Sequence, residues 1–525
     1  MLTPNQNEIV EQPGNLVVKA SAGTGKTHTM VKKIEYEIKN HRSHKVIAAI
    51  TFTVKAANEI KERLSINTRD HFIGTNNSFV IEEIIKPFMK DVYGRELKFD
   101  MSTDYSVKIM TFEEGIAMIK NKHLLCSYHN DRCNFIFQLA LDIAKKSSAC
   151  QLYLKSKYFK IYIDEYQDCD CDMHEFFMYL CDNLNIDTFI VGDEKQSIYT
   201  WRGADPKLFL SIWKKKNFSK KLLLDNFRSC QQIQNYSNLL YEETRPLYSE
   251  DDDLSSIIVV CTNSEDWISD VQPYIYPFQK SALLRHSNAD AELCAKGLTK
   301  CGLEFLYIPK IPISKITTDT AWFYNAIAKS LIVKTYSAYD FRNEIPNELN
   351  KNKEAIQQIK YFLKQIKKEI ANHDKYQFQN QVAHMAEHFG FTTKPEHCQW
   401  LYETIINKKF HLAFHVDDWQ RVSLTIHSSK GLEFDQVIVF LSDYPLSEPE
   451  SLYNHYVAIT RAKKRLIMVF LSDDKSCLLF SKNIGKILRE SKHTMYDVAT
   501  VLVYDKNSKQ FVHRTKETII SQYSK

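Results

Sequence analysis

The sequence predicts an α/β fold in which two parallel-sheet cores carry two mainly helical insertions, and three observations lead to this prediction. Short apolar runs alternate with amphipathic helical patterns in two separate parts of the chain, as expected of strands buried on both faces of a parallel sheet. Residues 85–149 and 311–419 break this rhythm and are mostly helical in pattern. The length of 525 residues exceeds what one hydrophobic core normally serves, so several domains are expected.

The candidate strands fall into two sets. The first set comprises residues 16–20, 45–52, 159–164, 188–192 and 221–227. The second set comprises residues 256–262, 281–286, 423–428, 436–442 and 465–471. Residues 54–64 have an amphipathic helical pattern, and residues 501–514 are predicted to form a terminal hairpin. The lysine-rich segment 350–370 predicts a helix with a solvated face.

The composition favours an ordinary cytoplasmic protein. The formal net charge of +5 is small for this length, so it permits a nucleic-acid groove without arguing for one. The twelve cysteines show no C-x-x-C framework, which favours free thiols in a reducing compartment. The sequence has neither a basic and apolar leader nor a long apolar run, so we expect no signal peptide and no membrane span.

Residues 16–30, LVVKASAGTGKTHTM, place an apolar strand before a run of small residues and a helical pattern after it. A loop that grips phosphate needs inward-facing backbone N–H groups, a lysine for the β and γ phosphates and a hydroxyl for Mg²⁺. The candidate loop residues are Ala22, Gly23, Thr24, Gly25, Lys26 and Thr27. The usual pattern has glycine where Ala20 stands, so a chance G-K-T turn stays an alternative at this point.

A second candidate for phosphate chemistry is the segment 158–168, YFKIYIDEYQD, in which an apolar strand ends at Asp164 and Glu165. One carboxylate at a strand tip can hold Mg²⁺, and its neighbour can orient or deprotonate the attacking water. The metal ligands predicted in this way are Thr27 and Asp164. Two adjacent acids could also form a mere turn, but the upstream loop makes that alternative weaker.

Cationic and aromatic residues follow further along the chain. Arg228 and Arg461 come from later parts of the chain than the loop, and an arginine supplied across a cleft can sense an intact γ-phosphate. Tyr199 and Trp201 beside Arg202 form an aromatic and cationic cluster of the kind that stacks unpaired bases without reading their sequence. The alternative for the two aromatic residues is ordinary core packing.

Taken in order, these motifs resemble those of the UvrD/Rep/PcrA group of superfamily 1 DNA helicases. The quoted segments are LTPNQNEIV, ASAGTGKT, ITFTVKAANEI, FIGTNNSF, DEYQD, VGDEKQSIYTWRGA, NFRS, TIHSSKGLEF and HYVAITRAKKRL. The resemblance implies two RecA-like P-loop NTPase cores that bind ATP and Mg²⁺, and removes the doubt about alanine in the loop. The implied domains are core 1A (1–84 and 150–225), insertion 1B (85–149), core 2A (226–310 and 420–525) and a reduced insertion 2B (311–419).

The resemblance also implies roles around the nucleotide. Gln6 would read the adenine, Phe227 would stack on it and Glu433 would meet the ribose. Lys33 stands where the family usually offers an arginine to the adenine. Gln196 would sense the γ-phosphate. The implied catalytic set is Lys26, Asp164, Glu165, Gln196, Arg228 and Arg461.

The DNA-binding residues implied by the resemblance are Thr51, Phe52, Thr53, Thr75, Tyr199, Trp201, Arg202, His427 and Lys430. Of these, His427 and Lys430 would couple ATP to DNA. The chain departs from the family where Asn76 and Asn77 replace an aromatic–histidine pair, and where residues 452–454 replace a basic pair. Its insertions are also shorter, which leaves duplex unwinding open while the ATP chemistry is kept.

A finer resemblance is to the helicase-like subunits of Gabija antiphage defence systems. It rests on FIGTNNSFVIEEIIKPF, KYFKIYIDEYQDCDCDMHEFFMYL and NFRSCQQIQNYSNLLYEETR. It implies a partner, an OLD-family ATPase with a Toprim nuclease domain, in a hetero-oligomeric complex that acts on DNA. Three functions stay open: a DNA-stimulated ATPase that translocates 3′ to 5′ or unwinds, a DNA-end sensor that licenses the nuclease, and a nucleotide-binding scaffold without turnover.

Overall fold

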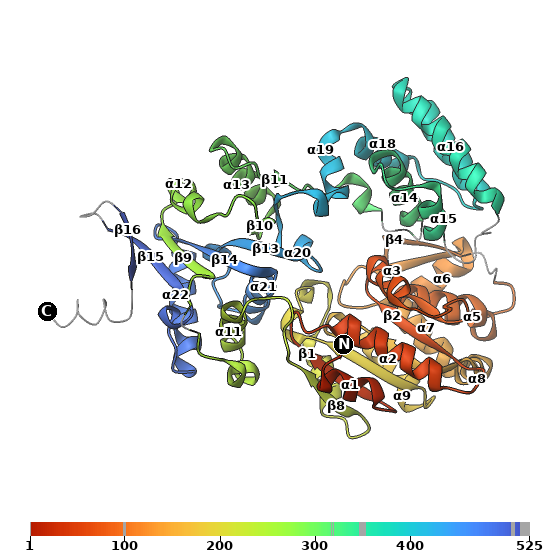
Figure 1. Cartoon of the computed structure of the whole chain (residues 1–525). Helices are drawn as coiled ribbons and strands as arrows, with labels where there is room; N and C mark the ends of the chain where they lie inside the picture. The colour runs from red at the N-terminus through yellow and green to blue at the C-terminus, as the bar shows by residue number, and fades with distance from the viewer. Residues whose placement is uncertain are drawn as a thin grey trace. The chain divides into compact units, whose positions relative to one another are not determined.

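The computed structural model describes residues 2–97, 101–251, 253–316, 318, 320–345, 353–505 and 510–514. The chain divides into two compact units. The first unit comprises residues 1–101, 107–275 and 426–525, and the second comprises residues 102–106 and 276–425. Strands and helices alternate along both ends of the chain, which confirms the predicted α/β class with parallel-sheet cores (Figure 1).

The first unit contains a six-stranded, fully parallel sheet in the order β3-β2-β6-β7-β1-β8. Its strands are β1 (Leu16–Ala20), β2 (Val46–Thr51), β3 (Phe72–Thr75), β6 (Tyr158–Ile163), β7 (Asp187–Gly192) and β8 (Ser219–Leu223). The five strands of the first predicted set are confirmed. The sequence did not predict β3, because it is a four-residue strand that contains a glycine.

The first unit also contains a second group of strands, in the order β13-β14-β9-β15-β16. They are β9 (Ile257–Thr262), β13 (Phe434–Phe440), β14 (Ala462–Leu471), β15 (Thr500–Asp505) and β16 (Gln510–Arg514). All pairs in this group are parallel except β15 with β16, which is antiparallel. The terminal hairpin is therefore confirmed, although residues 506–509 lie outside the described residues.

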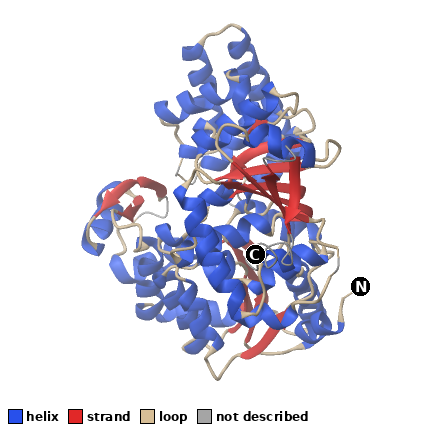
Figure 2. Ribbon diagram, turned by 90° about the vertical axis from the view of Figure 1, so that its left-hand side faces the viewer, coloured by secondary structure: helices blue, strands red, loops and turns tan. Residues whose placement is uncertain are grey.

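Helices connect these strands, and Figure 2 shows strands flanked by helices. Those of the first unit are α1 (Pro4–Glu11), α2 (Lys26–Asn40), α3 (Val54–Arg63), α4 (Asn76–Val80), α5 (Lys86–Tyr93), α6 (Phe112–Lys122), α7 (Phe135–Lys146), α8 (Ser148–Lys157), α9 (Cys171–Asp182), α10 (Pro206–Trp213), α11 (Gln231–Leu239), α12 (Trp267–Val271), α20 (Ile426–Ser429), α21 (Pro449–Ile459) and α22 (Lys475–Glu490). The insertion 85–149 also contains the strands β4 (Ser102–Ile109) and β5 (Leu124–Tyr128), so its helical prediction holds only in part.

The core of the six-stranded sheet lies around its four inner strands, β2, β6, β7 and β1, which are buried along almost their whole length. Ile9 of α1 and Met30 and Ile34 of α2 pack into the same cluster as the strand residues Val18 and Ile47. Helix α1 begins at a capping box, in which the Thr3 side chain and the Gln6 side chain each accept from the other residue's backbone N–H. This packing fixes the loop between β1 and α2 on a rigid base.

The second unit is mainly helical around a short parallel group of strands in the order β11-β12-β10. The strands are β10 (Ser281–Arg285), β11 (Leu306–Tyr307) and β12 (Arg421–Thr425). The helices are α13 (Asn288–Lys300), α14 (Ala321–Ile332), α15 (Ala338–Glu344), α16 (Lys353–Ala371), α17 (Lys375–His388), α18 (Pro395–Ile406) and α19 (Lys408–His411). This confirms helical structure for the described residues of 311–419, and Lys360, Lys364, Lys367 and Lys368 lie on an exposed face of α16.

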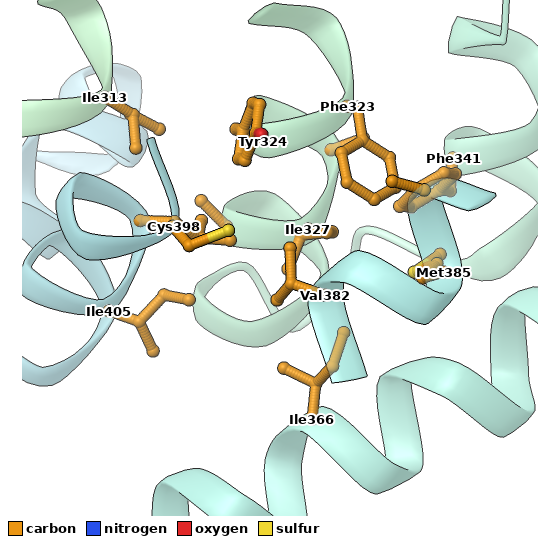
Figure 3. Close-up of a cluster of buried hydrophobic side chains, with 14 of the residues drawn as sticks. Ile313, Phe323, Tyr324, Ile327, Phe341, Ile366, Val382, Met385, Cys398 and Ile405 are labelled. Atoms are coloured by element: carbon orange, nitrogen blue, oxygen red, sulfur yellow. The ribbon is translucent and has the colours of Figure 1, made fainter. Parts of the chain in front are cut away.

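The helical part of the second unit has its own apolar core (Figure 3). The fully buried side chains of Phe323 and Ile327 on α14 face Val382 and Met385 on α17 in this cluster, and Ile366 of α16 completes it. Within the described residues, no helix combines the length and apolar composition needed to cross a bilayer. All twelve cysteines lie among the described residues and are free thiols.

Replacing Ile327 by alanine should destabilise this helical core, because a fully buried side chain would leave a cavity. The expected loss in free energy of unfolding is about 2–5 kcal/mol, measured by urea denaturation. The matched control is Tyr376→Ala in the same unit, where the side chain is 70% exposed and the expected change is below about 0.5 kcal/mol. Equal losses in the two variants would contradict the assigned core.

Candidate nucleotide and nucleic-acid site

The candidate site lies at the carboxyl ends of the parallel strands in the first unit. The loop 21–25 follows β1, Thr51 ends β2 and Thr75 ends β3, and residues 164–165 follow β6. Thr51 and Thr75 are register partners in neighbouring strands. Since ligands of open α/β sheets bind outside the carboxyl ends of the strands, this edge is the expected place for a site. It collects residues that are far apart in the sequence.

The phosphate loop joins β1, which is paired on both sides, to the 15-residue helix α2, whose first residue is Lys26. Gly23 and Gly25 both have left-handed backbones, with φ of 76° and 78°. A Cβ atom at Gly23 would lie 2.5 Å from Asn226 Oδ1 and 2.8 Å from Arg228 Cβ. Glycine is therefore required at position 23 both by its backbone angle and by the close approach of the segment after β8. The helix N-terminus gives the loop its ability to bind anions.

The predicted catalytic carboxylates lie beside the loop. Lys26 Nζ is 3.3 Å from Glu165 Oε1, and Thr27 Oγ1 donates a hydrogen bond of 3.3 Å to Asp164 Oδ2. Glu165 has a left-handed backbone with φ of 52°, and Gln167 donates to its carboxylate. A non-glycine residue in this conformation is strained, and such strain is concentrated at functional sites. Hydroxyl and carboxylate oxygens side by side are the ligands that Mg²⁺ prefers, so Thr27 and Asp164 fit that ion.

The two carboxylates have different electrostatic surroundings. Burial and the neighbouring Glu165 carboxylate raise the pKa of Asp164 above its ordinary value. Burial alone would raise the pKa of Glu165 as well, but the positive charges of Lys26 and Lys430 hold it below its ordinary value. The two lysines therefore favour the ionised form of Glu165, the form in which a carboxylate can orient a water by accepting its hydrogen bond.

Two arginines reach the same place, one from the segment after β8 and the other from the turn between α21 and β14. Arg461 follows α21, and its Nη2 donates a hydrogen bond of 3.1 Å to Gln196 Oε1. Arg228 donates to the Glu433 carboxylate at 2.8 Å and to the Thr460 carbonyl at 3.2 Å. Burial and the nearby Arg228 lower the pKa of Arg461 to about 9, so it stays charged at neutral pH. The two predicted arginine fingers and Gln196 are thus brought together.

Two residues predicted to meet the base contact the phosphate loop. Gln6 Nε2 is 3.4 Å from the Thr24 carbonyl, and the Phe227 N–H donates to the Gly23 carbonyl at 2.9 Å. The Phe227 side chain is 62% exposed, so its ring is free to cover a flat ligand.

The geometry corrects the role predicted for Lys33. Its fully buried ammonium donates to the carbonyls of Ile9, Val10 and Gln12 and pairs with Glu37 at 2.8 Å. Burial and the nearby Lys160 lower the pKa of Lys33 to about 8. Lys33 therefore anchors the end of the helix that carries Gln6, instead of offering a donor to adenine.

An aromatic and cationic cluster extends the site away from the phosphate loop. Arg202 lies 4.5 Å from the centre of the Trp201 ring and 5.7 Å from that of Tyr199. The His427 ring lies 6.0 Å from Tyr199 and 6.5 Å from Trp201, whose side chain is 54% exposed. The core-packing alternative therefore does not hold for Trp201.

Lys430 connects this cluster with the carboxylates. Its ammonium forms a buried ion pair with Asp168, lies 4.0 Å from Glu165 Oε2 and stands 4.7 Å from the centre of the Tyr199 ring. Sequence reasoning named Lys430 but not Asp168, although Asp168 ends the quoted DEYQD segment. The predicted positions Thr53 and Thr75 have local structural roles as N-caps of α3 and α4. Phe52, between Thr51 and Thr53, is half-buried.

Two family models match the chain. The UvrD/REP helicase N-terminal domain matches residues 2–125 and 93–217, and the UvrD-like helicase C-terminal domain matches residues 422–469. The matched regions contain the phosphate loop, the two carboxylates, the aromatic cluster, Lys430 and Arg461.

Curated relatives agree with these matches. The Gabija protein GajB of Bacillus cereus (strain VD045) is 38% identical over 498 residues, which cover 93% of this chain and 98% of that protein. The ATP-dependent DNA helicase Rep of Buchnera aphidicola subsp. Schizaphis graminum (strain Sg) is 22% identical, over 89% of this chain and 92% of that protein. The ATP-dependent DNA helicase PcrA of Bacillus subtilis (strain 168) is 27% identical over 58% of this chain and 50% of that protein. The chain therefore belongs to the UvrD family of ATP-hydrolysing DNA helicases and, within it, to the group that contains GajB.

Proposed function

We propose that this chain is a DNA-stimulated ATPase of a Gabija-type antiviral defence complex. The observation that carries the proposal is the position of Lys430, between the Glu165 and Asp168 carboxylates and the Tyr199 ring. A cation shared between a nucleotide site and a base-stacking cluster moves when either side changes, so it couples ATP turnover to DNA. The similarity to GajB over nearly the whole chain supports the assignment to defence.

The ATP chemistry follows from the groups beside the phosphate loop. Lys26 neutralises charge on the β and γ phosphates, and Thr27 with Asp164 would hold Mg²⁺, which supplies further charge neutralisation when bound. Glu165 orients and accepts a proton from the attacking water. Arg228, which follows β8, and Arg461, which follows α21, approach the γ-phosphate. Gln196 senses this phosphate and accepts a hydrogen bond from Arg461.

The remaining nucleotide contacts are proposed from exposure and proximity. Phe227 covers the adenine, Gln6 reads its edge and Glu433 accepts from the ribose hydroxyls. In the present structure Glu433 is held by Arg228 and by Lys463 at 3.2 Å. Nucleotide binding would therefore exchange these ion pairs for contacts to ribose and phosphate.

On the DNA side, Trp201 and Tyr199 stack bases, while Arg202 and His427 lie beside the strand. Thr51, Phe52, Thr53 and Thr75 would line the same strand at the ends of β2 and β3. The six-stranded sheet and the second group of strands would close on ATP and open after hydrolysis. This cycle would advance the chain along single-stranded DNA, in the 3′-to-5′ direction that the family resemblance implies. The domain boundaries predicted for cores 1A and 2A and insertions 1B and 2B belong to the same proposal.

The proposed partner is a nuclease subunit, an OLD-family ATPase with a Toprim domain. A second candidate function is that of a DNA-end sensor, which hydrolyses ATP to license this nuclease and unwinds little or nothing itself. The alignment with the Buchnera Rep helicase spans 618 positions, more than the 525 residues of this chain, so Rep carries segments that the chain lacks. Shorter insertions offer less surface for a duplex, which favours the sensor.

ATP hydrolysis by the purified chain should rise strongly when single-stranded or free-ended DNA is added, and Lys26→Ala should abolish it. Without this lysine the γ-phosphate loses its main protein cation. Steady-state phosphate release is the measurement. Lys32→Ala, on the exposed side of the same helix, is the matched control and should keep its turnover. Normal hydrolysis by Lys26→Ala would refute the ATPase site.

Glu165→Gln should bind ATP normally and hydrolyse it at least about a hundredfold more slowly, because the amide cannot accept the proton of the attacking water. Binding is measured with a fluorescent ATP analogue and turnover by single-turnover kinetics. Glu175→Gln, on an exposed position of α9, controls for the substitution itself. Loss of nucleotide binding in Glu165→Gln would contradict its assigned role.

A strand-displacement assay separates the two candidate functions. The translocating helicase should separate a duplex with a 3′ single-stranded tail when the chain is alone. The sensor should hydrolyse ATP on the same DNA without separating it, and should raise DNA cleavage when the nuclease partner is present. Unwinding by the chain alone would exclude the sensor as its main function.

A further inference from the structure

A buried polar network lies behind the phosphate loop and has no role in the chemistry described so far. The Ala22 N–H donates to the Tyr456 hydroxyl at 3.2 Å, and this hydroxyl donates to Asp193 Oδ2 at 3.4 Å. Lys195 pairs with Asp193 Oδ1 at 3.0 Å and donates to Ser21 Oγ at 3.3 Å. We call this group of side chains the latch; it consists of Tyr456, Asp193 and Lys195.

The latch joins three segments that are far apart in the chain. Tyr456 lies on α21, five residues before Arg461, and it is 434 residues away from Ala22. Asp193 follows β7 and also accepts from Gln196 Nε2 at 2.7 Å. The Tyr456 hydroxyl therefore contacts the phosphate loop on one side and, through Asp193, the residue that Arg461 touches on the other.

The polar groups of the latch are buried, so breaking their hydrogen bonds is costly in free energy. Asp193 is fully buried, Tyr456 is 3% exposed and Lys195 is 7% exposed. Burial alone would lower the pKa of Lys195, but the Asp193 carboxylate holds it above its ordinary value, so the ion pair stays charged. The ring of Tyr456 also packs edge-on against Tyr241 at 5.5 Å. A polar group leaving such a network loses a bond that water cannot replace without opening the core.

We propose that Tyr456 is a positioning residue. It holds Arg461 in its hydrogen bond with Gln196 when the six-stranded sheet and the second group of strands are closed on each other. The latch also communicates with DNA, because η3 (Glu194–Gln196) is followed after three residues by η4 (Thr200–Arg202) with its base-stacking side chains. A DNA strand that moves η4 also shifts the segment from Asp193 to Gln196, and the latch transmits this shift to Arg461. This inference rests on the proposed function and deepens it, since it assigns the DNA control of turnover to a hydroxyl outside the nucleotide contacts.

The test is Tyr456→Phe in the full chain, with Tyr236→Phe as the matched control. Tyr236 is fully buried, and its hydroxyl bonds His455 at 2.8 Å, beside Tyr456 in sequence, without contacting the phosphate loop. Tyr456→Phe should lower the kcat measured with single-stranded DNA about tenfold or more, the size expected for one lost hydrogen bond to a buried charged group. Its KM for ATP should change by less than about threefold, because no nucleotide contact is removed. The control should keep both values.

A second readout does not depend on turnover. Hydrogen–deuterium exchange of the peptide 16–30, with Mg²⁺ and a non-hydrolysable ATP analogue present, should become faster in Tyr456→Phe and stay unchanged in Tyr236→Phe. Asp193→Asn keeps the Tyr456 ring in place and tests the latch if Tyr456→Phe folds poorly. It removes the carboxylate that accepts from the Tyr456 hydroxyl and from Gln196, so it should also lower the kcat measured with single-stranded DNA.

The outcomes distinguish the latch from the proposed function. DNA-stimulated turnover in the wild type, with normal kcat and normal exchange in Tyr456→Phe, would overturn the latch and leave the ATPase intact. A wild type that DNA does not stimulate would refute the proposed function. In that case the hydrogen–deuterium exchange of peptide 16–30 still tests whether the latch holds the phosphate loop. Faster exchange in Tyr456→Phe but not in Tyr236→Phe supports the latch, and unchanged exchange refutes it.

Discussion

The buried ion pair between Lys430 and Asp168 is the contact on which the rest of the site depends. The Asp168 side chain is only 4% exposed and that of Lys430 is 14% exposed. Burial raises the pKa of Asp168 to about 6 although Lys430 opposes it. Removing one partner of a buried pair leaves an uncompensated charge, which costs about 3–5 kcal/mol. The segment after β12 is thereby held against the DEYQD segment, with Glu165 and Tyr199 both close to the same ammonium.

The parallel sheet explains why so many charges meet at one place. Each strand ends at the same edge, and β1, β6 and β7 are neighbours in the strand order, so their following residues converge. This edge holds Lys26, Glu165, Asp193 and Lys195 within one polar region. The resulting charges are compensated pairwise, which lets the site stay closed around buried ionised groups.

Much of this arrangement could be predicted from the sequence because buried strands of parallel sheets are continuous apolar runs. The strands β1, β2, β6, β7 and β8 were found in this way, and the loop and carboxylates followed from what stands after them. The strands β3, β4, β5 and β11 were missed, since β3 and β11 are short and β4 is only partly buried. A single sequence also holds no distances, so the contacts of Lys430 with Asp168, 262 residues away, and of Tyr456 with Ala22 required the structure.

The role of Lys33 shows the limit of transferring a position from a family pattern. A lysine in place of the usual arginine is too short and too deeply buried to act at a distance. It instead occupies the carbonyls at the end of α1, where a helix carries partial negative charge. The contact that the pattern assigned to a nucleotide has become a contact within the protein.

Gly23 carries two independent constraints, and their combination limits how the phosphate loop can evolve. Its left-handed backbone disfavours every side chain, and Asn226 with Arg228 fills the space where a Cβ would lie. A smaller residue at position 226 would relieve the crowding but not the backbone strain. A substitution of Gly23 would therefore need more than one compensating change, so we expect it to be rare in evolution.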